Sequence, residues 1–142
     1  MWNMLKSTLI SLQEDWTVEY LELDPSLYEF MERAPVPRLQ DWSFDRRRVE
    51  GWVAWLERKF ILPASQGNHV LLYIDSAPEG MGIYLNHRRI ATYAAPADDA
   101  PPFELDISRE VQPGQNVIAL RVEGTAPAIE GLALEVIAAD GG

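Results

Sequence analysis

Apolar and polar residues alternate along several short runs, the pattern of β-strands that are buried on one face. The run "WTVEYLEL", from Trp16 to Leu23, predicts the first strand. Six more short runs, rich in branched or aromatic residues and bounded by turn-forming residues, predict further strands: Ala54 to Leu62, Val70 to Asp75, Met81 to Leu85, Arg89 to Tyr93, Val117 to Val122 and Gly131 to Ile137. Many short strands separated by turns indicate an all-β sandwich or jelly roll.

Two short segments near the N-terminus have helical spacing instead. In the first, apolar residues are placed to share one face of an amphipathic helix: Trp2, Leu5, Leu9 and Leu12. In the second, "DPSLYEFMER", Asp24 can cap a helix and Pro25 can occupy its first position. The sequence therefore predicts one or two short helices near the N-terminus.

Irregular segments connect these elements. The chain from Ala34 to Gly51 is charged, aperiodic and contains proline, which predicts a long loop, and Pro96 to Pro102 forms a second loop. Asn86 and His87 stand between two predicted strands, where a tight hairpin needs positive φ; asparagine tolerates this better than histidine. Asp106 is placed to cap the single turn "ISREV".

Length and charge limit the classes of function. The chain of 142 residues is long enough for one domain, residues 1–142, with a single core. It has 12 basic and 22 acidic residues, a formal net charge of -10. Such a chain repels phosphate backbones, and its densest basic run, Arg46 to Arg48, has acidic neighbours. We expect no nucleic-acid partner.

The sequence also argues against thiolate chemistry and membrane insertion. Without cysteine there is neither a disulfide nor a thiolate metal site, and the two histidines are placed in or before turns. No metal or cofactor is predicted, although a calcium site using Asp75, Asp98 or Asp99 stays open. The N-terminal residues lack the regions of a signal peptide, and no apolar run reaches membrane-spanning length. We expect a soluble, cytoplasmic protein without a membrane partner.

A resemblance to a known family is carried by four segments, in this order: "SLQEDWTV" (Ser11 to Val18), "VP" (Val36-Pro37) with "WLERKFILP" (Trp55 to Pro63), "IYLNHRRIATY" (Ile83 to Tyr93) and "PFELDISREVQPGQNVIALRV" (Pro102 to Val122). They resemble the N-terminal sugar-binding domain of family 2 glycoside hydrolases, the β-galactosidase and β-glucuronidase group. The resemblance spans nearly the whole chain and implies a jelly-roll sandwich of the galactose-binding-like type.

The departures from the family pattern concern activity. Leu56, Glu57 and His87 replace the tyrosine, the first arginine and the hairpin glycine of the family's motifs. The segment "AAPADDAP" stands where the family has a glycine-rich aromatic stretch that reaches toward the active site. The family's catalytic glutamates belong to a barrel domain that 142 residues cannot contain. The resemblance therefore implies a non-catalytic domain, and we predict that the chain is not an enzyme.

Arg58 interrupts an otherwise apolar row. With a period of two, Arg58 shares one face with Leu56 and Phe60, so its side chain is expected to point toward the interior. A buried guanidinium is costly unless a carboxylate or carbonyl pairs with it. The family's signature arginine and the aspartate of its Asp-Ile-Thr run recur here as Arg58 and Asp106. The resemblance implies that these two residues form a structural ion pair.

Sugar-binding modules stack an exposed aromatic ring on a sugar and fix the hydroxyls with polar groups. The candidate contacts on predicted loops are the rings of Trp42, Trp52 and Tyr93 and the polar residues Arg46, Arg47, Asp98 and Asp99. The alternative is that these rings only cover the ends of the sandwich. Trp55, which matches the family's signature tryptophan, is expected to be structural.

Two functions of different class remain open. In the first the chain is a non-catalytic carbohydrate-binding module, which needs an exposed ring in a shallow groove with polar walls. In the second it is an interaction or scaffold domain, including an accessory subunit of a glycosidase, without sugar binding of its own. That function needs an exposed apolar patch, which the segment from Trp2 to Leu12 could supply. The partners are therefore a carbohydrate or a protein, and a homodimer is possible.

Overall fold

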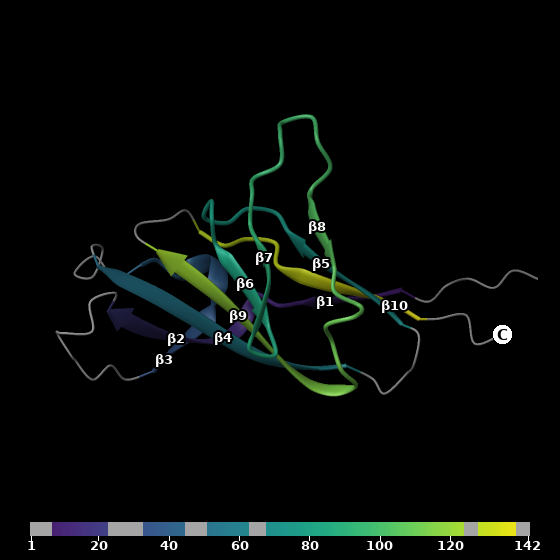
Figure 1. The fold of residues 1–142 in the computed structure, drawn as a ribbon, viewed down its shortest axis with the longest axis horizontal. Helices are drawn as coiled ribbons and strands as arrows, with labels where there is room; N and C mark the ends of the chain where they lie inside the picture. Colours follow the sequence, from purple (N-terminus) through teal and green to yellow (C-terminus); the bar gives the residue numbers. More distant parts are fainter. Residues whose placement is uncertain (1–6, 23–32, 45–50, 63–67, 124–127, 139–142) are drawn as a thin grey trace, which may run out of the picture.

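The computed structural model describes residues 7–22, 33–44, 51–62, 68–123 and 128–138, which form two antiparallel β-sheets (Figure 1). The larger sheet has six described strands in the order β3 (Ala34–Arg38), β2 (Glu14–Glu22), β4 (Trp52–Leu62), β9 (Gly114–Glu123), β6 (Gly82–Leu85) and β7 (Arg88–Thr92). The smaller has four, in the order β1 (Ser7–Ser11), β10 (Ala133–Ile137), β5 (His69–Ile74) and β8 (Phe103–Asp106).

The core lies between the sheets, where alternate residues of each strand point inward. In β5 and β10 the buried positions alternate with half-buried or exposed ones, as a period of two requires. Fully buried aliphatic side chains come from both sheets: Leu56, Ile83, Ile118 and Leu120 from the larger, and Leu72, Ile74 and Leu134 from the smaller. This arrangement confirms the all-β sandwich that the alternating pattern and the resemblance predict.

The N-terminal helix prediction is wrong for the residues that the structure describes. Residues 7–11 form β1, which pairs with β10 from Ser7↔Ile137 to Ser11↔Ala133. The spacing of Leu9 and Leu12 fits a helix, but pairing along the whole strand overrides that local preference. The second predicted helix, from Asp24, lies outside the described residues apart from its last residue, which is not helical.

The long loop predicted from Ala34 to Gly51 is wrong in its first part. Residues 34–38 form β3, and residues 39–41 form a short 3-10 helix, the one helix in the described part of the chain. Val36 pairs with Trp16 of β2 and is buried, which anchors the strand although prolines flank it. Proline is compatible with an edge strand, so the prolines hid this strand from the sequence pattern.

Two asparagines hold the turn regions of the larger sheet together. Asn86 and His87 have φ angles of 50° and 69°, which confirms the predicted β6–β7 hairpin. The amide of Asn86 donates to the side-chain oxygen of buried Asn116 at 3.0 Å. Asn116 also accepts from the Gln112 amide and donates to the carbonyls of Gln112 and Gly114. Each polar atom of the Asn116 side chain is therefore satisfied.

Candidate functional site

Arg58 lies on β4 in a row of alternate residues that are otherwise buried, as the sequence pattern predicts. Its side chain is half-buried, and Nε donates to the carbonyl of Glu14 at 2.6 Å. Asp106 ends β8 in the other sheet, and the structure contains no ion pair between these two described residues. The predicted partner of Arg58 is therefore wrong, because a backbone carbonyl of the neighbouring strand satisfies the guanidinium instead.

Asp106 caps the turn after β8, as the sequence predicts. Its Oδ1 accepts hydrogen bonds from the hydroxyl of Ser108 at 2.6 Å and from the Ser108 amide at 2.9 Å. These two bonds, the hydroxyl first, hold the pKa of the Asp106 carboxyl below its ordinary value. The role of Asp106 is thus local to its own turn.

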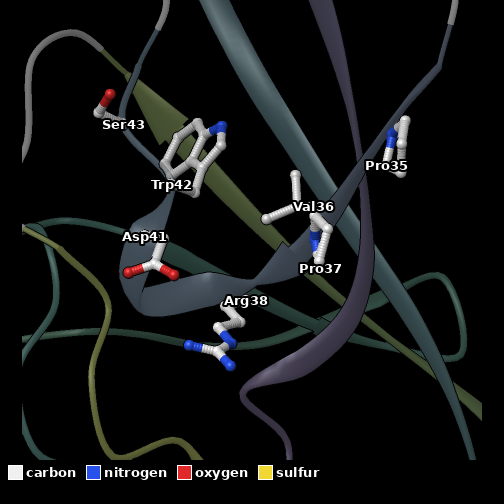
Figure 2. A pocket seen from close by; sticks show the side chains of 7 residues that line it. All are labelled: Pro35, Val36, Pro37, Arg38, Asp41, Trp42 and Ser43. Atoms are coloured by element: carbon white, nitrogen blue, oxygen red, sulfur yellow. The ribbon is translucent and has the colours of Figure 1, made fainter.

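An open pocket of about 500 Å³ lies beside β3 and the turn that follows it. Its lining residues come from one short stretch of the chain: Pro35, Val36, Pro37, Arg38, Asp41, Trp42 and Ser43. Figure 2 shows these side chains, with the indole of Trp42 and the side chains of Asp41 and Ser43 on the turn and Arg38 at the end of the strand. An aromatic ring and three polar side chains thus line one hollow, the general design of a small-molecule site.

The ring of Trp42 is held in place from the core side. Trp42 is half-buried, packs against the core, and lies with its ring centroid 6.2 Å from that of buried Phe44. Phe44 in turn makes an edge contact with Tyr20 of β2, at 5.2 Å between centroids. The indole is therefore fixed by packing and still contributes to the pocket surface, as a stacking platform must.

The turn that carries Trp42 is anchored by buried and hydrogen-bonded groups. Leu39 is fully buried, and its amide donates to the carbonyl of Gln13 at 2.6 Å. The Gln13 side chain donates to the Gln40 side chain at 3.1 Å and to the carbonyl of Ile129 at 3.0 Å. The amide of Trp42 closes the 3-10 turn by donating to the carbonyl of Leu39. The pocket wall is therefore preorganised.

The polar side chains of the pocket have no hydrogen-bond or ion-pair partner in the described part of the chain. Within the described residues, the side chains of Arg38, Asp41 and Ser43 have neither a hydrogen bond nor an ion pair. Arg38 and Asp41 are exposed, so water satisfies both charges in the absence of a ligand. A guanidinium, a carboxylate and a hydroxyl therefore line the same pocket as the Trp42 ring and are able to hydrogen-bond to the hydroxyls of a ligand.

The other candidate sugar contacts do not join this pocket. Tyr93 is buried and packs on Phe103 with ring centroids 5.1 Å apart, so the prediction that its ring meets a sugar is wrong. Trp52 is the first residue of β4 and packs, half-buried, against the core. Asp98 and Asp99 are exposed on the loop between β7 and β8, which projects from the sandwich in Figure 1. Arg46 and Arg47 lie outside the described residues.

The sequence offers Trp42 as a candidate ligand contact but does not single out the polar residues that line the same pocket. Arg38, Asp41 and Ser43 were assigned to an irregular loop, where charged and hydroxyl side chains are ordinary solvated groups. The available signal was the pair Val36-Pro37, whose match to a family motif indicates an ordered segment next to them. That signal locates a strand but not the pocket beside it.

A second polar cluster lies on the outer face of the smaller sheet. The hydroxyl of Tyr73 is 2.9 Å from Glu135 and 3.1 Å from Glu104. The hydrogen bond with Glu135, with desolvation and Glu104 adding to it, raises the pKa of Tyr73 to about 12. The pKa of Glu135 is lowered by hydrogen bonds from the Ser7 hydroxyl and from Tyr73. This cluster links β1, β10, β5 and β8 through their side chains.

Neither a metal cluster nor a spanning helix occurs in the described part of the chain. Among those residues, no three histidine, aspartate or glutamate side chains gather where they could hold a metal ion. Of the candidates for calcium, Asp75 follows β5 and lines an open pocket together with Pro102, whereas Asp98 and Asp99 lie on the loop between β7 and β8. No helix in the described ranges has the length and apolar character needed to cross a membrane. The cytoplasmic location stays a prediction.

Solved structures share the β-sandwich fold of this chain. A glycosyl hydrolase family 2 member from Bacteroides cellulosilyticus matches 94% of the chain with 20% identity and a TM-score of 0.60. A β-glucuronidase of an uncultured Clostridium species matches 99% with 18% identity and a TM-score of 0.65. A β-glucuronidase from Ruminococcus gnavus matches 99% with 17% identity and a TM-score of 0.61.

These matches establish the fold, and the chain spans less than a third of the length of each matched protein. The chain covers 21% of the Bacteroides cellulosilyticus protein and 30% of each of the two β-glucuronidases. Neither a protein-family model nor a curated protein matches the sequence. The β-sandwich fold that the resemblance implies is confirmed. The described residues form two antiparallel sheets and no barrel.

Proposed function

We propose that the chain is a non-catalytic carbohydrate-binding domain of the family 2 glycoside hydrolase type, and that the pocket beside Trp42 is its binding site. The observation that carries this proposal is the combination of a fixed, half-exposed indole with three polar side chains that have no partner among the described residues. The solved structures with this fold are glycoside hydrolases, which supports a carbohydrate as the ligand.

In this proposal, each residue that lines the pocket has its own role in binding a sugar. The apolar face of a pyranose stacks on the Trp42 ring, while Val36 and the prolines exclude water from its edge. Asp41 accepts hydrogen bonds from sugar hydroxyls, and Arg38 and Ser43 donate to hydroxyl or ring oxygens. Because the pocket is open and small, we expect weak binding, with dissociation constants near the millimolar range.

The absence of catalysis is part of the proposal. Glycoside hydrolysis needs two carboxyl groups about 5–10 Å apart across a cleft. Within the Trp42 pocket, Asp41 is the one carboxylate among the lining residues. The described residues thus supply this pocket with a binding surface but not with an acid–base pair.

Titration calorimetry against a panel of simple sugars tests the proposal. The matched variants are Trp42→Ala, which removes the pocket ring, and Trp55→Ala, which removes a second half-buried ring on the larger sheet, 4.7 Å from Tyr84. We expect at least one sugar to bind the unmodified chain and the Trp55 variant, and binding to be lost in the Trp42 variant. If no sugar binds at millimolar concentration, the carbohydrate function is wrong.

The second candidate is an interaction or accessory domain. Three large apolar side chains are exposed among the described residues: Leu9, Leu21 and Ile61. In addition, the chain spans less than a third of the length of the hydrolases that share its fold. A chain that binds no sugar but binds a glycosidase subunit in a pull-down with purified components would favour this function over the first.

A further inference from the structure

The four described edge strands of the two sheets differ in how they are protected. Unpaired edge strands can pair with another chain, and natural proteins block them with proline or charge. Of the edges, β3 has Pro35 and Pro37, and β7 begins with Arg88 and Arg89. The short edge β8, "FELD", contains two carboxylates, whereas β1, "STLIS", has neither a charge nor a proline.

The uncharged strand β1 is also exposed, both along one edge and at its central side chain. Within the described residues β1 pairs with β10 alone, so the backbone groups on its other side have no strand partner. Leu9, at the centre of the strand, is 70% exposed on the outer face. Ile10 beside it packs partly against the core and fixes the strand in place. The edge is therefore ordered, apolar at its centre and without a strand partner among the described residues.

We propose that two copies of the chain pair through β1, antiparallel and centred on Leu9. This register places Leu9 opposite Leu9, Thr8 opposite Ile10, and Ser7 opposite Ser11. The two smaller sheets then join into one sheet of eight strands around a two-fold axis. The exposed leucines become a cross-strand apolar pair, and the small serines at each end admit the partner backbone without a clash.

Charge favours a second copy at this edge over other contacts between two copies. Each chain has a net charge of -10, so most faces repel their equivalents. The nearest carboxylate to Leu9 across the sheet is Glu135, which is its partner on β10. In the paired sheet the two Glu135 residues are separated by three strand spacings, about 14 Å, which exceeds the screening length of about 8 Å at physiological salt.

The size of the contact sets its strength. One five-residue strand pair buries less surface than a standard stable interface. The dimer is therefore expected to be weak and reversible, and salt should strengthen it by screening the like charges of the two chains. The leucine pair also lies beside an open pocket of about 500 Å³, to which Leu9, Ser11 and Tyr73 contribute.

Sedimentation velocity, from micromolar to near-millimolar concentration at low and moderate salt, tests the proposal. The variant Leu9→Lys puts a charge at the centre of the edge, where Glu135 can accept it within the same chain. The matched control is Ile61→Lys, because Ile61 is 74% exposed on β4 of the other sheet and undergoes the same chemical change. Circular dichroism checks that both variants are folded.

We expect the unmodified chain and Ile61→Lys to shift toward dimer with rising concentration, and Leu9→Lys to remain a monomer. Hydrogen exchange of the residue 7–11 amides should slow over the same concentration range. A wild type that is monomeric throughout, or a dimer that Leu9→Lys leaves intact, would overturn the proposal. So would a wild-type monomer whose residues 7–11 are protected only by an added basic peptide, because the edge would then accept a foreign strand.

Discussion

The turn around Asn116 and the pocket beside Trp42 use polar side chains in opposite ways. Asn116 is fully buried, and its amide makes hydrogen bonds to Asn86, Gln112 and Gly114. In the pocket, the side chains of Arg38, Asp41 and Ser43 make none among the described residues. Asn116 lies near the start of β9, and the pocket lies beside β3 and the turn that follows it, so both regions belong to the larger sheet and differ in the placement of their hydrogen-bonding groups.

This difference separates residues that stabilise the fold from residues that are available to a ligand. A buried polar atom that loses its partner costs free energy of folding, whereas an exposed one is solvated and costs almost nothing. Substitutions around Asn116 should therefore lower stability and leave any binding unchanged in the folded protein. Substitutions in the Trp42 pocket should do the reverse. The following experiments measure both quantities for each region.

The largest effect on stability is expected from Asn116→Ala. The change leaves the Gln112 amide and two carbonyls without their partner and opens a small cavity, which should lower the free energy of unfolding by about 3 kcal/mol. Urea unfolding measures it, with the exposed neighbour Gln115→Ala as control. A loss as small as that of the control would show that the network is not structural.

Trp42→Ala should have the largest effect on binding. Loss of the stacking platform is expected to weaken sugar affinity at least tenfold, which corresponds to about 1.4 kcal/mol. Since the ring also packs on Phe44, some stability will be lost as well, but less than in the Asn116 variant. Calorimetry and urea unfolding on the same sample separate the two. Unchanged affinity in a folded Trp42 variant would remove the pocket from the account.

Arg38→Ala and Asp41→Ala should weaken sugar binding and leave the stability of the fold almost unchanged. Their side chains are exposed and have no partner in the described part of the chain, so each change should alter stability by less than about 0.5 kcal/mol. Each should still weaken sugar binding severalfold, because one polar contact is lost. A clear loss of stability in either variant would mean that the polar groups of the pocket serve the fold after all.

The smallest effect concerns the hydrogen-bonded cluster around Tyr73, which is only partly buried. Folding raises the pKa of Tyr73 from 10.0 to about 12, so the folded state retains a proton that the unfolded chain loses. The contribution to stability is full below about pH 10 and disappears as the pH rises through about 12. Tyr73→Phe should remove this dependence in urea unfolding at alkaline pH. A dependence that persists in the variant would assign it to other groups.

Much of the fold could be predicted because burial imposes a period of two on most strands. The pattern located β2, β4 and β5 to within two residues at each end, and Asn86-His87 indicated the hairpin. It failed at β1, where Leu9 is exposed and the leucine spacing fits a helix. It also failed at β3, whose prolines are typical of loops. Edge strands have one open side, so their sequences carry less of the burial pattern.

The site was predicted only in part because its geometry depends on which strands become neighbours. Trp42 could be proposed from its residue type, but nothing local shows that Tyr93 is buried or that Arg38 has no partner. For Arg58 the sequence correctly indicated an inward direction and a need for a partner. The choice of Asp106 was wrong because Arg58 donates to the Glu14 carbonyl, while Asp106 accepts from Ser108 in its own turn.

The most direct test of sugar binding beside Trp42 is a heteronuclear NMR titration of the labelled chain with the sugars of the calorimetric panel. We expect shift changes confined to residues 35–43 and the Trp42 indole N–H, with the amides of Asn86 and Asn116 unchanged. If no sugar changes any shift at millimolar concentration, or if the changes map to another surface, the pocket beside Trp42 is not a sugar site.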